Sequence, residues 1–283
     1  MAVAARWDDD VTVVSPPTAH RAGNEDYLDL MKRILTNTIY QDPPVSRAEA
    51  AFDGDRRATG QDWPSVAHTM VGRARLDNVH ACAATAITEG IPGDLVETGV
   101  WRGGTAIFMR AVLRAYGVTD RLVWACDSFE GMPVSGPDSH PSDQQTRLHL
   151  ANAVLAIPLE QVRANFDVYG LLDDQVRFLK GWFRDTLPTA PIERIAVLRL
   201  DGDLYESTMD TLDSLYPKVS PGGFVIIDDY QIPACAEAVH DYRAAHGITA
   251  PLTRIDQWAV FWRLQGPSSN ESEPAQKGPG QGH

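Results

Sequence analysis

Residues 197–206 read Val-Leu-Arg-Leu-Asp-Gly-Asp-Leu-Tyr-Glu, an apolar run that ends in two aspartates, Asp201 and Asp203. A second apolar run, residues 224–227, also ends in a pair, Asp228 and Asp229. Short runs of this kind are typical of buried strands. Carboxylates at short range raise one another's pKa and repel, so four of them at neighbouring strand ends would be costly. A divalent cation is the obvious compensation.

The pattern around these two runs alternates between strands and helices. We expect strands over 95–97, 122–126, 176–179, 195–200 and 223–227, and helices over 106–116, 159–169, 205–216 and 235–246. Such alternation predicts an α/β fold with a doubly wound, mainly parallel sheet and helices on both faces. Residues 253–256 and 259–263 predict a terminal antiparallel pair.

The chain is expected to divide into four parts. Residues 1–22 are predicted to be a flexible arm, 23–92 an N-terminal helical and lid segment, 93–265 the α/β domain, and 266–283 a disordered tail rich in Pro, Gly, Ser, Gln and Glu. The second part has helical spacing from Tyr27 and again over 76–88, around a polar stretch at 41–63. A polar loop of that length is often a lid, although an oligomer contact or a plain surface loop is an alternative.

Composition excludes several classes of function. The 283 residues are 43% hydrophobic, which supports a real core, and carry a net charge of -13. A nucleic-acid-binding protein needs a basic surface, and an anionic membrane would repel this chain. No apolar run approaches the ~18 residues of a membrane span, and we find no signal peptide. Three widely spaced cysteines fit neither a disulfide framework nor a zinc site, so we expect a reduced, cytoplasmic protein.

A glycine-rich stretch follows the first expected strand. Residues 97–105 read Glu-Thr-Gly-Val-Trp-Arg-Gly-Gly-Thr and lead into a helix. Glycine lets a ligand approach the backbone, and Glu97 just before Gly99 suits a positive or hydroxylated group better than a pyrophosphate. The stretch lacks the dinucleotide fingerprint GxGxxG. The alternative is an ordinary turn from strand to helix.

Two further strand ends carry candidate ligand contacts. Asp127 ends the second strand, where an acidic residue commonly accepts hydrogen bonds from ribose hydroxyls; the alternative is a cap or turn aspartate. Gly181-Trp182-Phe183 follows the third strand. An aromatic ring at that position can cover a purine, and core packing of either ring is an equal alternative.

The aspartates after the last two parallel strands should meet at the carboxyl edge of the sheet, where open α/β folds bind ligands. Asp201, Asp228 and Asp229 offer the hard oxygen ligands that suit Mg²⁺. The alternative is that some of these aspartates cap the helices that follow, and Asp203 is a candidate for such a cap.

Taken together, these motifs resemble the macrocin O-methyltransferase family. The resemblance rests on Glu97-Thr-Gly-Val-Trp-Arg-Gly-Gly, Asp127-Ser-Phe-Glu-Gly, Gly181-Trp-Phe, Leu200-Asp-Gly-Asp-Leu-Tyr and the stretch 220–230, Ser-Pro-Gly-Gly-Phe-Val-Ile-Ile-Asp-Asp-Tyr. Residues 39–44 and 67–78 resemble the family as well. The similarity runs from about 26 to 264 and leaves out both ends of the chain.

The resemblance implies a Rossmann-like class I methyltransferase that uses S-adenosylmethionine and Mg²⁺ to methylate a deoxysugar hydroxyl of an antibiotic. It implies a cofactor site formed by Thr69, Met70, Glu97, Gly99, Asp127, Ser128, Gly181, Trp182 and Asp201. It makes Asp201, Asp228 and Asp229 the metal ligands and Asp203 the general base. A narrower expectation is the 4-hydroxyl of noviose in an aminocoumarin such as novobiocin.

Several alternatives remain open at this point. A macrolide deoxysugar 3-O-methyltransferase or a catechol-type enzyme acting on a phenol would use the same cofactor and metal. His140, in the loop after Gly131, is a rival base or substrate contact, and loop histidines are usually solvated. A protein that binds NAD or a nucleotide sugar is a different class, which the missing GxGxxG opposes. We expect a small glycosylated antibiotic as partner, and a homodimer.

Overall fold

The computed structural model describes residues 12–13, 22–45 and 51–265. Its centre is an eight-stranded sheet with the order β1-β7-β8-β6-β5-β2-β3-β4. Five consecutive strands, which include the β4 edge of the sheet, are parallel: β2 (Asp94–Thr98), β3 (Val123–Asp127), β4 (Val176–Lys180), β5 (Ile195–Leu200) and β6 (Val219–Ile227). The predicted parallel sheet is therefore confirmed, and all five strands lie where the apolar runs placed them.

The other edge of the sheet is mixed. Strand β8 (Val260–Arg263) runs antiparallel to β6, and β7 (Thr253–Arg254) runs antiparallel to β8. This confirms the predicted antiparallel C-terminal strand. A two-residue strand, β1 (Thr12–Val13), pairs in parallel with β7. Of the predicted N-terminal arm, residues 1–11 and 14–21 lie outside the described residues, as does the whole predicted tail, and Ala22 begins a helix. The four-part division of the chain stays a prediction.

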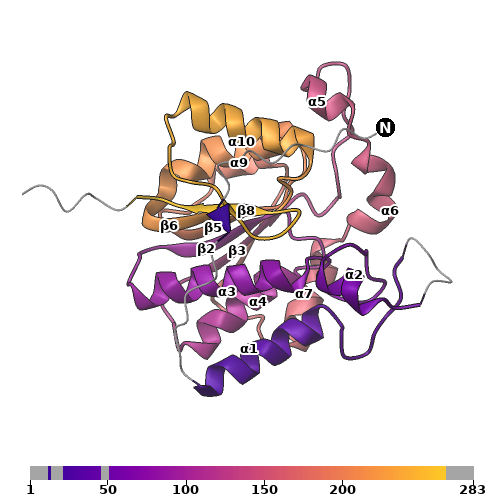
Figure 1. Ribbon diagram of the computed structural model, residues 1–283, viewed down its shortest axis with the longest axis vertical. Helices are drawn as coiled ribbons and strands as arrows, with labels where there is room; N and C mark the ends of the chain where they lie inside the picture. Colours follow the sequence, from indigo (N-terminus) through magenta and orange to yellow (C-terminus); the bar gives the residue numbers. More distant parts are fainter. Residues whose placement is uncertain (1–11, 14–21, 46–50, 266–283) are drawn as a thin grey trace, which may run out of the picture.

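Helices cover both faces of the sheet (Figure 1). One face packs against α1 (Ala22–Leu35), α3 (Arg73–Thr88), α4 (Gly104–Ala115) and α7 (Leu159–Val168). The other packs against α9 (Tyr205–Leu215) and α10 (Pro233–Ala245). Successive strand residues alternate between the two cores, as Leu95 and Val96 do in β2, because strand side chains point to opposite faces in turn.

Short elements complete the fold. They are α2 (Gly54–Ala58), α5 (Pro141–Gln144), α6 (Asn152–Leu155), α8 (Phe183–Thr186) and 3₁₀ turns at Leu148–Ala151, Leu187–Thr189 and Tyr216–Lys218. Helix α2 lies within the stretch predicted to be a loop. Its N-terminus is capped by Asp53, whose carboxylate accepts hydrogen bonds from the backbone of Asp55 and Arg56. In the described part of the chain, no helix is long and apolar enough to cross a bilayer.

Candidate functional site

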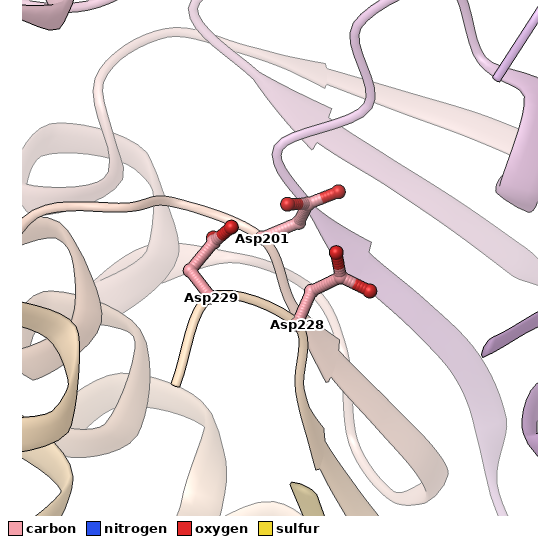
Figure 2. Close-up of side chains that lie close together, drawn as sticks. All are labelled: Asp201, Asp228 and Asp229. Atoms are coloured by element: carbon pink, nitrogen blue, oxygen red, sulfur yellow. The ribbon is translucent and has the colours of Figure 1, made fainter. Parts of the chain in front are cut away.

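The aspartates at the ends of β5 and β6 lie together. The register pairs Leu200 with Ile227, so Asp201 and Asp228 follow directly on neighbouring parallel strands. One carboxylate oxygen from each of Asp201, Asp228 and Asp229 lies within 4.8 Å of the other two. Figure 2 shows the three side chains gathered where the two strands end. The fold thus assembles an all-oxygen donor set from residues 27 and 28 positions apart in sequence.

Two buried arginines, which the sequence patterns did not single out, share this cluster. Arg199 lies in β5, is fully buried, and its guanidinium contacts the carboxylates of Glu97, Asp201 and Asp228. The Nη1 atom of Arg199 lies 2.8 Å from Asp201 Oδ2. Arg75, on α3, binds the other oxygen of Asp228. The positive charges of Arg199 and Arg75 therefore neutralise part of the carboxylate charge that the sequence analysis assigned to a divalent cation.

The two arginines do not neutralise all of the aspartates equally, and the pKa values of the aspartates differ accordingly. Burial would raise the pKa of Asp228, but Arg199 and Arg75 outweigh it and hold that pKa below its ordinary value. No arginine in the described part of the chain pairs with Asp229, so burial and then the charge of Asp203 raise its pKa well above the ordinary range. Burial and neighbouring aspartate charges raise the pKa of Asp203 to about 7.

This donor set fits an oxygen-ligated divalent cation. Among the residues that the structure describes, no guanidinium forms an ion pair with Asp229, and its Oδ2 atom accepts a hydrogen bond from the backbone N–H of Asp203 at 3.0 Å. The carboxyl of Asp229 therefore lacks a cationic partner among the described residues, and a bound divalent cation would favour its ionised form. Hard carboxylate oxygens in this number suit Mg²⁺, which usually retains water or substrate oxygens in its other positions.

Asp203 does not cap the helix that follows it. Helix α9 starts after Leu204, which provides no side-chain cap. Its first backbone N–H groups, at Tyr205 and Glu206, instead donate to the two oxygens of Asp143 at 2.7 and 3.0 Å. Asp203 has a left-handed backbone with φ of +59°, a conformation that is uncommon outside glycine. The capping alternative for Asp203 is wrong, and its side chain is left to line the cavity.

Two adjoining cavities open at this edge of the sheet, with volumes of about 360 and 330 Å³. The first is lined by the predicted residues Thr69, Met70, Glu97, Asp203, Asp228 and Asp229. The second is lined by Ser128 and Trp182. Gly99, Asp127, Gly131, Met132 and Asp201 line both. The predicted cofactor and metal residues therefore surround one continuous region, except Gly181, which lines neither cavity.

Glu97 lies at the end of β2 and is 1% exposed. Burial raises its pKa to about 8, against the opposing charge of Arg199. Its Oε1 atom binds Arg199, whereas its buried Oε2 atom has no hydrogen-bond partner among the described residues. A buried polar atom normally has a partner, so Oε2 is suited to accept a hydrogen bond from a ligand in the first cavity.

Asp127 and Ser128 also hold the local backbone. Asp127 accepts hydrogen bonds from the backbone N–H groups of Val100 and Phe129, both at 2.7 Å. The Ser128 hydroxyl donates to the carbonyl of Gly131 and accepts from the backbone N–H of Glu130, both at 3.0 Å. The turn role proposed as the alternative for Asp127 is thus present, and contact with a cofactor stays a prediction for both.

The glycines are needed for backbone packing. Gly99 has φ of +85°, and a Cβ atom there would lie 1.8 Å from the carbonyl oxygen of Asp201. Gly181 has φ of +145°, and its Cβ would lie 2.5 Å from Thr186 Cγ2. Gly99 thus allows the end of β2 to approach the end of β5, a reason that differs from the ligand approach inferred from sequence. Of the two aromatic rings after Gly181, Trp182 lines the second cavity, whereas Phe183 lines it and also packs against the core.

His140 lies apart from the cluster. Its ring stacks on Tyr205 with centroids 3.5 Å apart, and its backbone N–H donates to Glu206 at 2.7 Å. It is not among the residues that line either cavity. This placement favours Asp203 over His140 as the proton acceptor.

Known proteins resemble this chain along most of its length. An 8-demethyl-8-(2,3-dimethoxy-alpha-L-rhamnosyl)-tetracenomycin-C 4'-O-methyltransferase of Streptomyces olivaceus is 63% identical over 251 residues, which cover 88% of this chain and 96% of that protein. A mycinamicin III 3''-O-methyltransferase of Micromonospora griseorubida is 54% identical, covering 88% of this chain and 99% of that protein. A demethyldecarbamoylnovobiocin O-methyltransferase of Streptomyces niveus is also 54% identical, covering 84% and 92%.

The solved structure of the O-methyltransferase NovP is 53% identical, covers 86% of this chain and 99% of that chain, and superposes with a TM-score of 0.84. The predicted Rossmann-like class I methyltransferase fold is thereby confirmed, and the chain is an O-methyltransferase. The family model of macrocin-O-methyltransferase (TylF) matches residues 24–264, so the chain belongs to that family.

Proposed function

We propose that this enzyme transfers the methyl group of S-adenosylmethionine to a hydroxyl of a deoxysugar carried by an antibiotic precursor, with Mg²⁺ bound by Asp201, Asp228 and Asp229. The observation that carries the proposal is the carboxylate cluster at the junction of two cavities. The two cavities together provide room for the methyl donor and the acceptor, which would meet at the metal ligands.

When bound, S-adenosylmethionine supplies an electrophilic methyl group, and Mg²⁺ lowers the pKa of the acceptor hydroxyl. The protein's own task is to align the two reactants, exclude water and take up one proton. Asp203 lines the first cavity beside the three metal ligands, which places it to accept the hydroxyl proton as the new carbon–oxygen bond forms and the carbon–sulfur bond of the donor breaks, leaving S-adenosylhomocysteine. Glu97, which lines the same first cavity, and Asp127, which lines both cavities, would hold the donor.

The names of the relatives guide the choice of acceptor. The relative with 63% identity is named for the 4'-hydroxyl of a rhamnosyl group, and one with 54% identity is named for a 3''-hydroxyl. A 4-hydroxyl of a rhamnose-type sugar is therefore the acceptor we propose. Noviose in an aminocoumarin stays a narrower prediction, supported by the novobiocin enzyme at 54% identity. Cytoplasmic location and a homodimer also stay predictions.

The proposal is tested by product analysis. The purified enzyme is incubated with S-adenosylmethionine, Mg²⁺ and the rhamnosylated tetracenomycin for which the relative from Streptomyces olivaceus is named. A desmethyl macrolide glycoside, a desmethyl novobiocin precursor and a simple catechol serve as competing acceptors. We expect a product with one added methyl group on a sugar oxygen, located by NMR. Methylation of the catechol alone would overturn the proposal in favour of a phenol methyltransferase.

A further inference from the structure

One wall of the first cavity is an extended stretch just before α3. We call residues 64–71, all of which the structure describes, the wall segment. It contains no helix or strand apart from one isolated bridge at Pro64. Thr69, Met70 and Val71 of this segment line the first cavity. Because the segment has no regular hydrogen bonds of its own, its position depends on bonds to other parts of the chain.

Two acceptors hold the backbone N–H groups of the wall segment. Asp42 Oδ2 accepts from the backbone of Val66 and Ala67 at 2.6 and 3.2 Å. The carbonyl oxygen of Leu35, the last residue of α1, accepts from the next two backbone N–H groups at 3.0 and 3.3 Å. These bonds tie the wall segment to α1 and to the chain that follows it.

The carbonyl groups of the wall segment bind the glycine-rich stretch instead. Arg102 Nη1 donates to the carbonyl oxygens of Pro64 and Ala67 at 3.1 and 2.8 Å. The backbone N–H of Gly104, the first residue of α4, donates to the carbonyl oxygen of His68 at 2.9 Å. Arg102 thus supplies two of these three bonds, and it does so from a single nitrogen atom.

Arg102 is itself held in place. Its guanidinium carbon lies over the ring of Trp101, 4.1 Å from the ring centroid. Its backbone carbonyl accepts a hydrogen bond at 2.9 Å from Nδ2 of Asn165, a buried residue on α7. Trp101 lines the first cavity and donates from Nε1 to the carbonyl of Val154 at 2.9 Å. A guanidinium that is fixed in this way loses little freedom when it binds the wall segment.

The wall segment lies directly against the start of α4. A Cβ atom at Gly104 would lie 2.4 Å from the carbonyl oxygen of His68 and 2.7 Å from Thr69 Cβ. The backbone of the two segments is therefore in close contact at this point. The bonds that hold this contact also set how far Thr69 and Met70 stand from the glycine-rich stretch.

We propose that Arg102 is a positioning residue for the methyl donor, because it fixes the wall segment, and with it Thr69 and Met70, against the glycine-rich stretch. The inference rests on the proposed function, in which Glu97 and Asp127 hold the donor. All four of these residues line the first cavity, so a ligand held by the last two is enclosed by the wall segment. Arg102 lines neither cavity and therefore acts through the wall segment.

The acceptor shares this cavity with the donor, because the metal ligands line it as well. We therefore expect acceptor binding to weaken too when Arg102 is lost. The test avoids this overlap by measuring the affinity for S-adenosylhomocysteine in the absence of any acceptor, by calorimetric titration of the full-length enzyme.

The variants are Arg102→Met and Arg102→Lys, with Arg163→Met as the matched control. Arg163 is exposed on α7, lies over the ring of Phe178 at 5.3 Å, and is outside the lining of both cavities. For Arg102→Met we expect the Kd to rise at least about tenfold, which corresponds to about 1.4 kcal/mol. Amide hydrogen exchange should rise in residues 65–71 and stay unchanged in β5 and β6. The control should match the wild-type enzyme.

Lysine should replace Arg102 in large part. Both carbonyl groups are reached by one nitrogen of Arg102, and the lysine ammonium also offers several N–H donors from one nitrogen. The Kd of Arg102→Lys should therefore stay within about threefold of the wild-type value. A loss as large as that of Arg102→Met would overturn the role of the two carbonyl bonds.

A measurement on the wild-type enzyme keeps the test decisive if Arg102→Met does not fold. S-adenosylhomocysteine should slow amide exchange in residues 65–71, and exchange that does not respond would overturn the inference. A Kd of folded Arg102→Met within about threefold of the wild-type value would also overturn it. If the wild-type enzyme binds no S-adenosylhomocysteine, the proposed function fails. Exchange in the ligand-free variants then still decides whether Arg102 holds the wall segment.

Discussion

Replacing Arg199 by methionine should destabilise the enzyme strongly. Arg199 is fully buried in β5 and contacts three carboxylates. Asp228 would keep Arg75 as a partner, and Asp201 is 27% exposed. Glu97 would be left without any ion-pair partner, because Arg199 is its only one in the described structure. Its side chain is also almost fully buried, so water cannot replace the lost contact.

The expected loss is about 3–5 kcal/mol, the usual cost of leaving one member of a buried ion pair alone. Glu97 limits the loss by binding a proton. Its folded pKa of about 8 lies above the ordinary 4.5, so ionisation of Glu97 lowers stability as pH rises from 4.5 toward 8. Without Arg199 the pKa of Glu97 rises further, so the stability of the variant goes on falling at pH values above 8, where that of the wild type no longer falls. The difference in stability between variant and wild type should therefore be larger near about pH 9 than near about pH 6.

Urea denaturation of the metal-free protein measures this loss. Arg184→Met is the matched control, because Arg184 is 68% exposed and its ion-pair distance to Asp185 is 3.7 Å. We expect the control to change stability by less than about 0.5 kcal/mol. A loss below about 1 kcal/mol for Arg199→Met, or a loss that shrinks with rising pH, would refute the reasoning.

Three further outcomes are expected. Asp203→Asn should bind S-adenosylhomocysteine and Mg²⁺ normally in calorimetric titrations but lose roughly 10²–10⁴-fold in kcat, and near-normal turnover would reject Asp203 as the base. Gly99→Ala should fail to fold at normal yield, because its Cβ would lie 1.8 Å from the Asp201 carbonyl oxygen; a variant with wild-type stability would show that the backbone approach is unimportant. The hydrogen bonds of Asp42 outweigh its burial and lower its pKa from 3.8 to about 2. The ionised carboxylate should therefore contribute about 2 kcal/mol to the free energy of unfolding above pH 4, and this contribution is lost as pH falls through 2. An NMR titration of the Asp42 carboxyl carbon with a midpoint near 3.8 would contradict this.

Much of the fold could be predicted because local patterns dictate it. Five apolar runs with helical patterns between them specified the parallel strands, and the aspartates after 200 and 227 placed a site at their carboxyl ends. Parallel pairing then brought Asp201 and Asp228 together without further information.

The parts that sequence reasoning missed depend on contacts between distant residues. Arg199 was read only as one member of an apolar run, although a charged residue two positions before Asp201 was a signal for a buried ion pair. Its partner Glu97 lies opposite it on β2, 102 positions away. The cap of α9 is supplied by Asp143, 62 positions before Tyr205, and nothing near α9 in sequence indicates it.

The stretch 41–63, which was predicted to be a lid, shows the same limit. Its polar composition predicted an open loop over the substrate. The structure instead contains a short helix, α2, and a fully matched guanidinium, Arg57, at its centre. Polar residues usually indicate solvent exposure, so a polar interior is difficult to recognise until the tertiary contacts are known.

The central claim is that methyl transfer to a sugar hydroxyl depends on a divalent cation held by Asp201, Asp228 and Asp229. The most direct measurement follows product by mass spectrometry with metal-stripped enzyme, S-adenosylmethionine and the desmethyl rhamnosyl acceptor, with and without added Mg²⁺. We predict no methylated product in the presence of EDTA and restored methylation when Mg²⁺ is added in excess. Full methylation by the metal-stripped enzyme would contradict the account.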